Sequence, residues 1–184
     1  GFGKDDPDIN PFSRYARNFF IPLAGRASHL KGWDVKETDC HLGFAGLPQS
    51  ATGQTSLWTG VNGSRAMGRH MTGFPGPTLI KVIRQYSMVK LLCQAGLKSS
   101  LLNAYSDGYL DRIRLKPRLA SASTHIQQAS GQPLKTLNDL AEKKAMFMDI
   151  THEIMHQVFP GSAERFPVLD PEERGVDLVK MARD

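Results

Sequence analysis

The sequence predicts an α/β fold that carries a mostly helical cap. Three observations lead to this prediction. A helix, a glycine, a buried strand and a polar loop succeed one another within residues 79–105, as in the return half of a β–α–β unit. A turn rich in glycine and proline leads into a short helix near residue 50. Residues 107–165 show helical patterns and little strand signal, as a helical insertion would.

Length and composition exclude several classes of protein. The chain has 184 residues, enough for one ordinary domain or a core with a modest insertion. Hydrophobic residues make up 40% and charged residues 22%, a globular composition that argues against disorder. No apolar run approaches the roughly 18 residues of a membrane span, so we expect no integral membrane protein. The net charge of +5 suits binding to anionic small molecules or to nucleic acid and decides neither.

The two cysteines indicate a reducing compartment. Cys40 and Cys93 are too few for a disulfide framework or a cysteine-only zinc site. The N-terminus shows no secretory signal. We therefore expect a cytoplasmic protein, and the sequence leaves its oligomeric state open.

The first part of the chain is predicted to alternate between helical and extended segments. Residues 13–21 have a helical pattern that a proline and a glycine then interrupt. Trp33 to Phe44 has apolar residues at strand-like spacing. Residues 50–60 are predicted to form a short helix, and residues 61–78 a glycine-rich loop.

The clearest predicted helix covers residues 79–95. Its apolar positions recur at the helical period, and they are Leu79, Val82, Ile83, Tyr86, Val89 and Cys93. Gly96 is the expected C-terminal stop. Residues 97–104 then predict a buried strand that ends in a polar loop, and functional groups collect at the carboxyl ends of such strands.

Further helices are predicted in the second half of the chain, near 136–145 and near 149–159. Asp107 is interpreted as the cap of a short helix over 108–113. Asp170 and the Pro171 after it form a strong helix start, because Asp caps well and Pro suits the first helical position.

Both ends of the chain look abrupt for an alternating α/β protein. Residues 1–8 resemble a loop of the kind found after a strand, and the helix from Asp170 has no stop signal. We therefore expect a fragment. Residues 1–106 would be the N-terminal part of a metal- and phosphate-binding core, 107–165 a cap-like insertion, and 166–184 the start of the return to a core whose C-terminal half is missing.

The segment from Gly46 to Gly60 carries the most chemistry. It places Ser50 where a turn enters a short helix. Free backbone N–H groups and the helix dipole favour an anion there, and a deprotonated serine can attack phosphorus or sulfur. The plainer alternative is that Ser50 is an ordinary N-cap.

This segment resembles the nucleophile segment of the alkaline phosphatase superfamily. Thr59-Gly60 comes after Ser50 at the spacing found in sulfatases and nucleotide pyrophosphatases of that superfamily. Gln49-Ser50-Ala51-Thr52-Gly53-Gln54 is similar to Asn-Ser-Glu-Val-Gly-His of cofactor-independent phosphoglycerate mutases. Gly1-Phe2-Gly3 resembles the residues just after the first metal-binding Asp in those enzymes. The resemblance is closest to bacterial metalloenzymes of the phosphoglycerate mutase-like group.

The resemblance implies a partial alkaline-phosphatase-like core, a mixed or parallel sheet flanked by helices. It also implies metal-dependent phosphoryl transfer or phosphate-ester hydrolysis on a small phosphorylated substrate. Two divalent ions (Mn, Zn or Mg) would hold Ser50 as an alkoxide, which would form a phosphoserine intermediate. The other metal ligands would lie before Gly1 or in a missing C-terminal half. We therefore expect these 184 residues alone to bind no metal pair and to be inactive.

Four further residues are candidates for substrate contact: Gln54, Arg69, His70 and Asn103. Gln54 replaces the His of the mutase pattern, so the choice between mutase and hydrolase stays open. Arg69 and His70 lie in the glycine-rich loop, where they suit phosphate contact or are simply solvated charge. Asn103 ends the predicted strand and either faces the site or forms a hydrogen-bonded turn.

A second motif offers a different function. His152-Glu153-Ile154-Met155-His156 matches H-E-x-x-H, which on a helix places two histidines on one face for a zinc peptidase. The alternative is an exposed helix face with two histidines and no zinc. A non-catalytic globular module is the third hypothesis. Basic clusters such as Lys143-Lys144 lack interleaved aromatic residues, so we expect no nucleic-acid binding.

Overall fold

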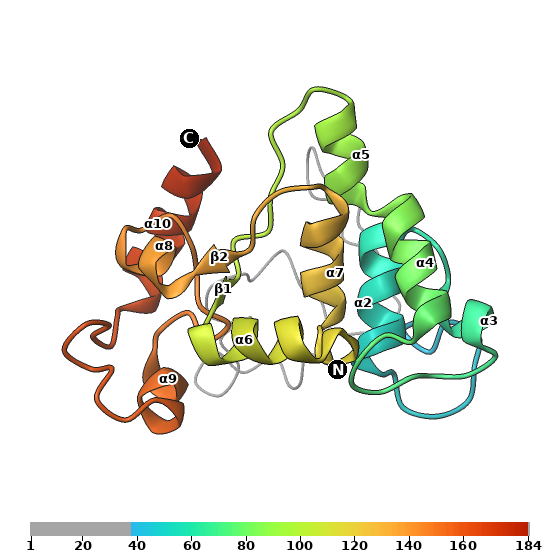
Figure 1. Cartoon of the computed structure of the whole chain (residues 1–184), viewed down its shortest axis with the longest axis horizontal. Coiled ribbons are helices and arrows are strands. Elements are labelled where there is room, and N and C mark those ends of the chain that lie inside the picture. Colours follow the sequence, from blue (N-terminus) through green and yellow to red (C-terminus); the bar gives the residue numbers. More distant parts are fainter. Residues whose placement is uncertain (1–37, 184) are drawn as a thin grey trace, which may run out of the picture. The chain divides into compact units, whose positions relative to one another are not determined.

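The computed structural model describes residues 38–183, and these are mostly helical with a small parallel sheet (Figure 1). The elements in chain order are α2 (Ser50–Thr59), α3 (Gly63–Met67), α4 (Pro77–Tyr86), α5 (Met88–Gln94), β1 (Ala104–Tyr105), α6 (Asp107–Leu115), a 3₁₀ turn (Pro117–Leu119), α7 (Ala122–Ala129), β2 (Lys135–Thr136), α8 (Leu137–Ala141), α9 (Glu153–Val158) and α10 (Pro171–Arg183). Within the described part, no helix is long and apolar enough to cross a membrane. The expected helix over 13–21 lies outside the described residues.

The sheet confirms an α/β class in its coarsest form. β1 pairs in parallel with β2, with Ala104 opposite Lys135 and Tyr105 opposite Thr136. The expected buried strand over 97–104 is wrong, because only its last residue belongs to β1 and Leu97 is 57% exposed.

Side chains satisfy backbone groups in the middle of that segment, whereas Leu102 and Ala104 bond to the backbone of Met146. The N–H of Leu101 donates to Gln127 Oε1, and Gln132 Nε2 donates to the carbonyl of Ser99. Backbone groups that already have partners need no ladder. The described end of the expected extended segment, residues 38–44, is likewise coil and turn.

The region from Ser50 to residue 78 is more helical than expected. The predicted helix over 50–60 is confirmed as α2, which ends at Gly60 in the left-handed conformation, with φ of 69°. The expected loop over 61–78 is wrong in part, because it contains α3 and the first residues of α4. α3 forms because Asn62 Oδ1 accepts a hydrogen bond from the N–H of Arg65 and so caps the helix.

The predicted helix over 79–95 is two helices. α4 ends at Tyr86 and α5 begins at Met88, with the buried Ser87 between them. The Ser87 hydroxyl donates to the carbonyl of Ile126 and accepts from the N–H of Lys90, so it caps α5. Gly96 is confirmed as the stop, with φ of 80°.

The later helices are shorter than expected. α8 occupies only the start of the expected 136–145 helix, with Thr136 and Asp139 forming a capping box. α9 covers the second half of the expected 149–159 helix. Ser106, not Asp107, caps α6. The start of α10 is confirmed, because Asp170 Oδ1 accepts from the N–H groups of Glu172 and Glu173.

Two apolar clusters hold these elements. The first joins α4, α5 and α7 through Ile83, Val89, Ala122 and Ile126, with Trp58 of α2 packed against it. The second surrounds β1, α8 and α9 and contains Ala104, Leu140, Ala145, Phe147, Met155 and Phe166. α2 packs on α3, α4, α5 and α7, which fixes the direction of its N-terminus.

Candidate functional site

Ser50 is the first residue of α2, and its side chain is exposed. Gln49 holds the N-cap position in an extended conformation, and its side chain makes no capping hydrogen bond. The interpretation of Ser50 as an N-cap is therefore wrong. The first N–H groups of α2 have no partner within the helix, and they lie at the positive end of its dipole. An anionic group beside the Ser50 hydroxyl would be stabilised there.

Two loops pack against this end of α2. The N–H of Met71 donates to Thr52 Oγ1, whose own hydroxyl donates to the carbonyl of Gln49. The ring of His70 reaches the carbonyl of Phe44 at 3.3 Å. Gly46 allows the next turn of the chain, because its φ of 103° is a conformation that other residues rarely adopt. The loop after α3 is thus bonded both to the first turn of α2 and to the loop that precedes α2.

Both ring nitrogens of His70 form hydrogen bonds within the protein. Nε2 lies at 3.3 Å from the carbonyl of Phe44, which can only accept, so Nε2 carries the proton. Nδ1 then accepts from the hydroxyl of Ser64 at 3.1 Å. His70 therefore positions the loop, and a contact with phosphate would require one of these bonds to break. Its neighbour Arg69 is exposed.

The other predicted contact residues lie in two different places. Gln54 is half-buried on α2, one turn after Ser50. Asn103 forms a parallel bridge with Met146 beside β1. Among the described residues, no side-chain hydrogen bond joins Ser50 to Gln54 or Asn103.

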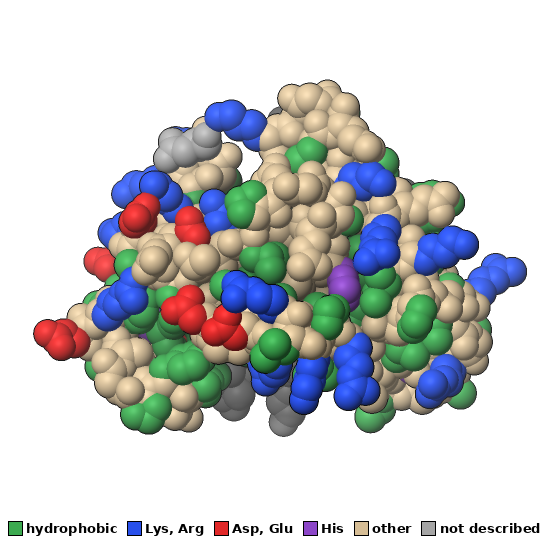
Figure 2. All heavy atoms as spheres, viewed as in Figure 1, with side chains coloured by type: hydrophobic (Ala, Val, Ile, Leu, Met, Phe, Trp, Pro, Cys, Tyr) green, Lys and Arg blue, Asp and Glu red, His purple; other side chains and the backbone are tan. Residues whose placement is uncertain are grey.

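The charge distribution along the chain adds a feature that the sequence analysis missed. Residues 40–106 contain no Asp or Glu, and their charged side chains are Arg65, Arg69, Lys81, Arg84, Lys90 and Lys98. Figure 2 accordingly shows Lys and Arg but no Asp or Glu over the side where α2 to α5 lie. Counting charged residues segment by segment, and not only over the whole chain, would have identified this stretch without carboxylates. The positive potential favours an anionic ligand near α2.

The H-E-x-x-H motif does not form a zinc-peptidase helix. His152 precedes α9 and adopts a left-handed conformation with φ of 70°, so the two histidines do not share a helix face. His152 Nδ1 contacts the carbonyl of Pro167 at 3.1 Å, and His156 Nε2 contacts the carbonyl of Phe166. Within residues 38–183, no three His, Cys, Asp or Glu side chains are grouped to hold a metal.

Comparison with known proteins leaves these predictions open. The chain matches no protein-family model, and it shows no significant match to a curated protein or a solved structure. The resemblance of the Ser50 segment to the alkaline phosphatase superfamily stays a prediction. The geometry on which a function can be argued is an exposed serine at an uncapped helix end, within a stretch that has no carboxylate.

Proposed function

We propose that the complete protein performs metal-dependent phosphoryl transfer or phosphate-ester hydrolysis, with Ser50 as the nucleophile. The observation that carries this proposal is the exposed Ser50 hydroxyl at the uncapped start of α2. A phosphate group placed there would meet unpaired N–H groups and the positive end of the helix dipole. The absence of Asp and Glu from residues 40–106 supports the same class of substrate.

In the proposed step, Ser50 Oγ attacks the phosphorus atom of a phosphate ester. A new P–O bond forms to serine, the bond to the ester oxygen breaks, and that oxygen leaves with a proton. Water or an acceptor hydroxyl then takes the phosphoryl group and frees Ser50. The N–H groups of α2 would stabilise the charge on the phosphoryl oxygens. The exposed Arg69 is a candidate cation for the same charge, because Met71, two residues after it, bonds to Thr52 in the first turn of α2.

The described residues do not fit a pair of divalent ions. They contain no group of three or more His, Cys, Asp or Glu side chains, and Ser50 is the one expected ligand among them. Any such ions would need their other ligands from outside residues 38–183. When bound, ions of this kind lower the pKa of a hydroxyl and neutralise phosphate charge.

The test uses the protein encoded by the complete reading frame. It is incubated with p-nitrophenyl phosphate and Mn²⁺, Zn²⁺ or Mg²⁺, turnover is followed by absorbance, and phosphoserine is located by mass spectrometry of peptides. We expect phosphate on Ser50, and a loss of turnover of roughly 10³-fold or more in Ser50→Ala.

Thr78→Ala is the matched control, because Thr78 is another exposed hydroxyl in the first turn of a helix, α4. It should retain both the turnover and the phosphate on Ser50. Full turnover in Ser50→Ala, or turnover in the wild type with no phosphate on Ser50 at any stage, would contradict the proposal.

A further inference from the structure

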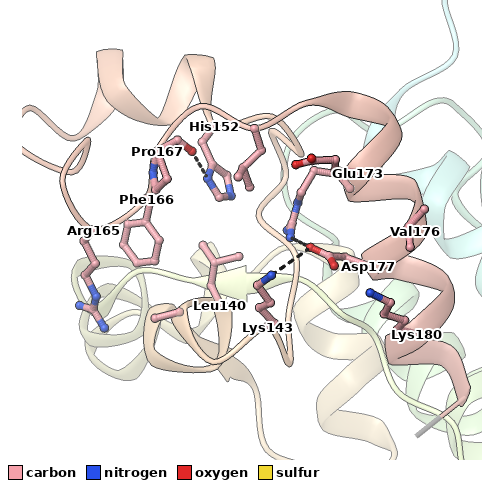
Figure 3. Close-up of a pocket in the computed structure, with 13 residues that line it drawn as sticks. Leu140, Lys143, His152, Arg165, Phe166, Pro167, Glu173, Val176, Asp177 and Lys180 are labelled. Atoms are coloured by element: carbon pink, nitrogen blue, oxygen red, sulfur yellow. Dashed lines mark hydrogen bonds and ion pairs between the residues drawn. The ribbon is translucent and has the colours of Figure 1, made fainter.

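A cavity of about 480 Å³ lies between α8, the start of α10 and the segment that joins α9 to α10 (Figure 3). Its apolar wall includes Leu140, Phe166 and Val176. The volume is in the range that small-molecule sites occupy. Neither Ser50 nor any other residue of the proposed nucleophile segment lines the cavity, so a ligand bound there would be independent of the proposed function.

Positive charge exceeds negative charge around the cavity. Four cations line it against two carboxylates, which leaves a net charge of +2 with neutral histidine; the residues are Lys143, Arg165, Arg174 and Lys180 against Glu173 and Asp177. The excess positive charge falls on a few of these side chains, because the other charged side chains of the lining have partners.

Arg174 and Asp177 satisfy each other. Arg174 is buried and donates to Asp177 at 3.1 Å, as well as to the carbonyl of Ile150. Lys143 Nζ lies 3.9 Å from the same Asp177 carboxylate, which is a weak ion pair. Lys180 makes no ion pair with the described residues that line the cavity. The ammonium groups of Lys143 and Lys180 are therefore available to an anion.

His152 supplies an unsatisfied acceptor in the cavity wall. Its side chain is only 3% exposed, and its ring lies across the cavity from the two lysines in Figure 3. Nδ1 donates its proton to the carbonyl of Pro167, so the neutral ring leaves a lone pair on Nε2. Burial lowers the pKa of His152 more than this hydrogen bond raises it, which favours the neutral ring.

No group among the described residues donates to His152 Nε2. The atom is also screened from bulk water, with less than 1 Å² accessible. Buried acceptors without a donor cost free energy, so a donor carried into the cavity would be stabilising. Contact with a ligand therefore requires the side chains that cover this atom to move.

Two residues that line this cavity also have strained backbone conformations. Of the described residues other than glycine, Leu42, Lys143 and His152 have positive φ, and the last two line the cavity. Such conformations are unfavourable for residues with a Cβ and tend to persist at functional sites.

We propose that this cavity binds a small anion that also carries a hydroxyl group. The anionic group pairs with Lys143 and Lys180, and the hydroxyl donates a hydrogen bond to His152 Nε2. The two contacts come from opposite sides of the cavity, so a ligand must present both groups at once. Phosphorylated polyols and hydroxycarboxylates have this chemistry.

The test compares four probes by isothermal titration calorimetry on the full chain. Glycerol 3-phosphate and glycerate carry both groups, and they distinguish a phosphate from a carboxylate ligand. Methyl phosphate carries the charge without the hydroxyl, and glycerol carries hydroxyls without the charge. We expect at least one of the first two probes to bind about fivefold or more tightly than methyl phosphate, and glycerol to bind weakest.

Variants separate the two contacts. Lys180→Ala should weaken every anionic probe about fivefold, whereas Arg183→Ala, on the same helix but outside the cavity, should not. His152→Gln should weaken only the probes with a hydroxyl group. If this variant does not fold, Val176→Trp at the exposed edge of the cavity should abolish binding by filling it.

Three results would overturn the proposal. They are the absence of binding by all four probes, equal effects of Lys180→Ala and Arg183→Ala, and binding that survives Val176→Trp.

Discussion

Two buried histidines carry polar atoms that the fold does not satisfy. His125 in α7 is 8% exposed and His152 is 3% exposed, and the Nε2 atom of each lacks a hydrogen-bond partner among residues 38–183. Burial lowers the pKa of His125, and the nearby charge of Arg84 lowers it further. Both histidines are therefore held in the neutral form, since a proton on either ring would be poorly solvated.

We predict that the protein loses stability on acidification, in part through His125. Below a pH of about 6.5, the unfolded chain binds a proton at this histidine while the folded chain resists it. The free energy of unfolding must then fall as the pH drops from about 6.5 toward the lowered pKa. His125→Leu removes this titration and also an unsatisfied buried nitrogen. Urea denaturation at about pH 7.5 and about pH 5 should show a smaller acid-induced loss in this variant.

Gln128→Leu is the control for the acid effect, because Gln128 is an exposed residue of the same helix, α7, and carries no titratable group. Its loss of stability between the two pH values should equal that of the wild type. The explanation fails if His125→Leu loses as much stability as the wild type does.

The break between α4 and α5 shows how a single hydroxyl sets an element boundary. Leu79, Ile83 and Val89 are all buried as a continuous helix would require, so the apolar period gives no sign of the interruption. Ser87 makes the break stable, because its hydroxyl bonds both to α7 and to the first turn of α5. Serine before Met88 is a possible cap by residue type, but its distant partner Ile126 cannot be identified from local sequence.

Other elements also differ in this respect: some are determined by neighbouring residues and some by residues far along the chain. α2, the Gly96 stop and the Asp170 cap were predictable, because each depends on neighbouring residues. The coil before β1 was not, because Gln127 and Gln132 satisfy its backbone from far along the chain. At the site, the place of Ser50 on α2 was predictable, whereas the commitment of both His70 nitrogens depends on tertiary contacts.

We predict that Ser87→Ala destabilises the protein by about 1–3 kcal/mol. The variant loses two hydrogen bonds and leaves the N–H end of α5 and the carbonyl of Ile126 with fewer partners. Urea denaturation at neutral pH measures the change. Gln85→Ala, at an exposed position of α4, should stay within about 0.5 kcal/mol of the wild type. Equal stabilities of the two variants would show that Ser87 does not hold the break.

At the scale of the described chain, charge and packing are both distributed unevenly. The net charge of +5 conceals a stretch of residues 40–106 without a single carboxylate side chain, and all 18 Asp and Glu residues lie outside it. The two apolar clusters also share no residue, one lying among α4, α5 and α7 and the other around β1, α8 and α9. The basic stretch contributes half of the buried residues of the first cluster, whereas the cavity beside α10 is built on the second.

The separation of the clusters predicts additive effects of core truncation. Ile126 and Met155 are fully buried, one in each cluster, and truncating either to alanine should cost about 2–5 kcal/mol. Because they belong to clusters with no common residue, the double variant should lose the sum of the two costs to within about 0.5 kcal/mol. Ile126→Ala with Ile83→Ala, both in the first cluster, is the matched pair that should depart from additivity. Urea denaturation of the single and double variants measures each term, and strong coupling between Ile126 and Met155 would mean that the two clusters act as one core.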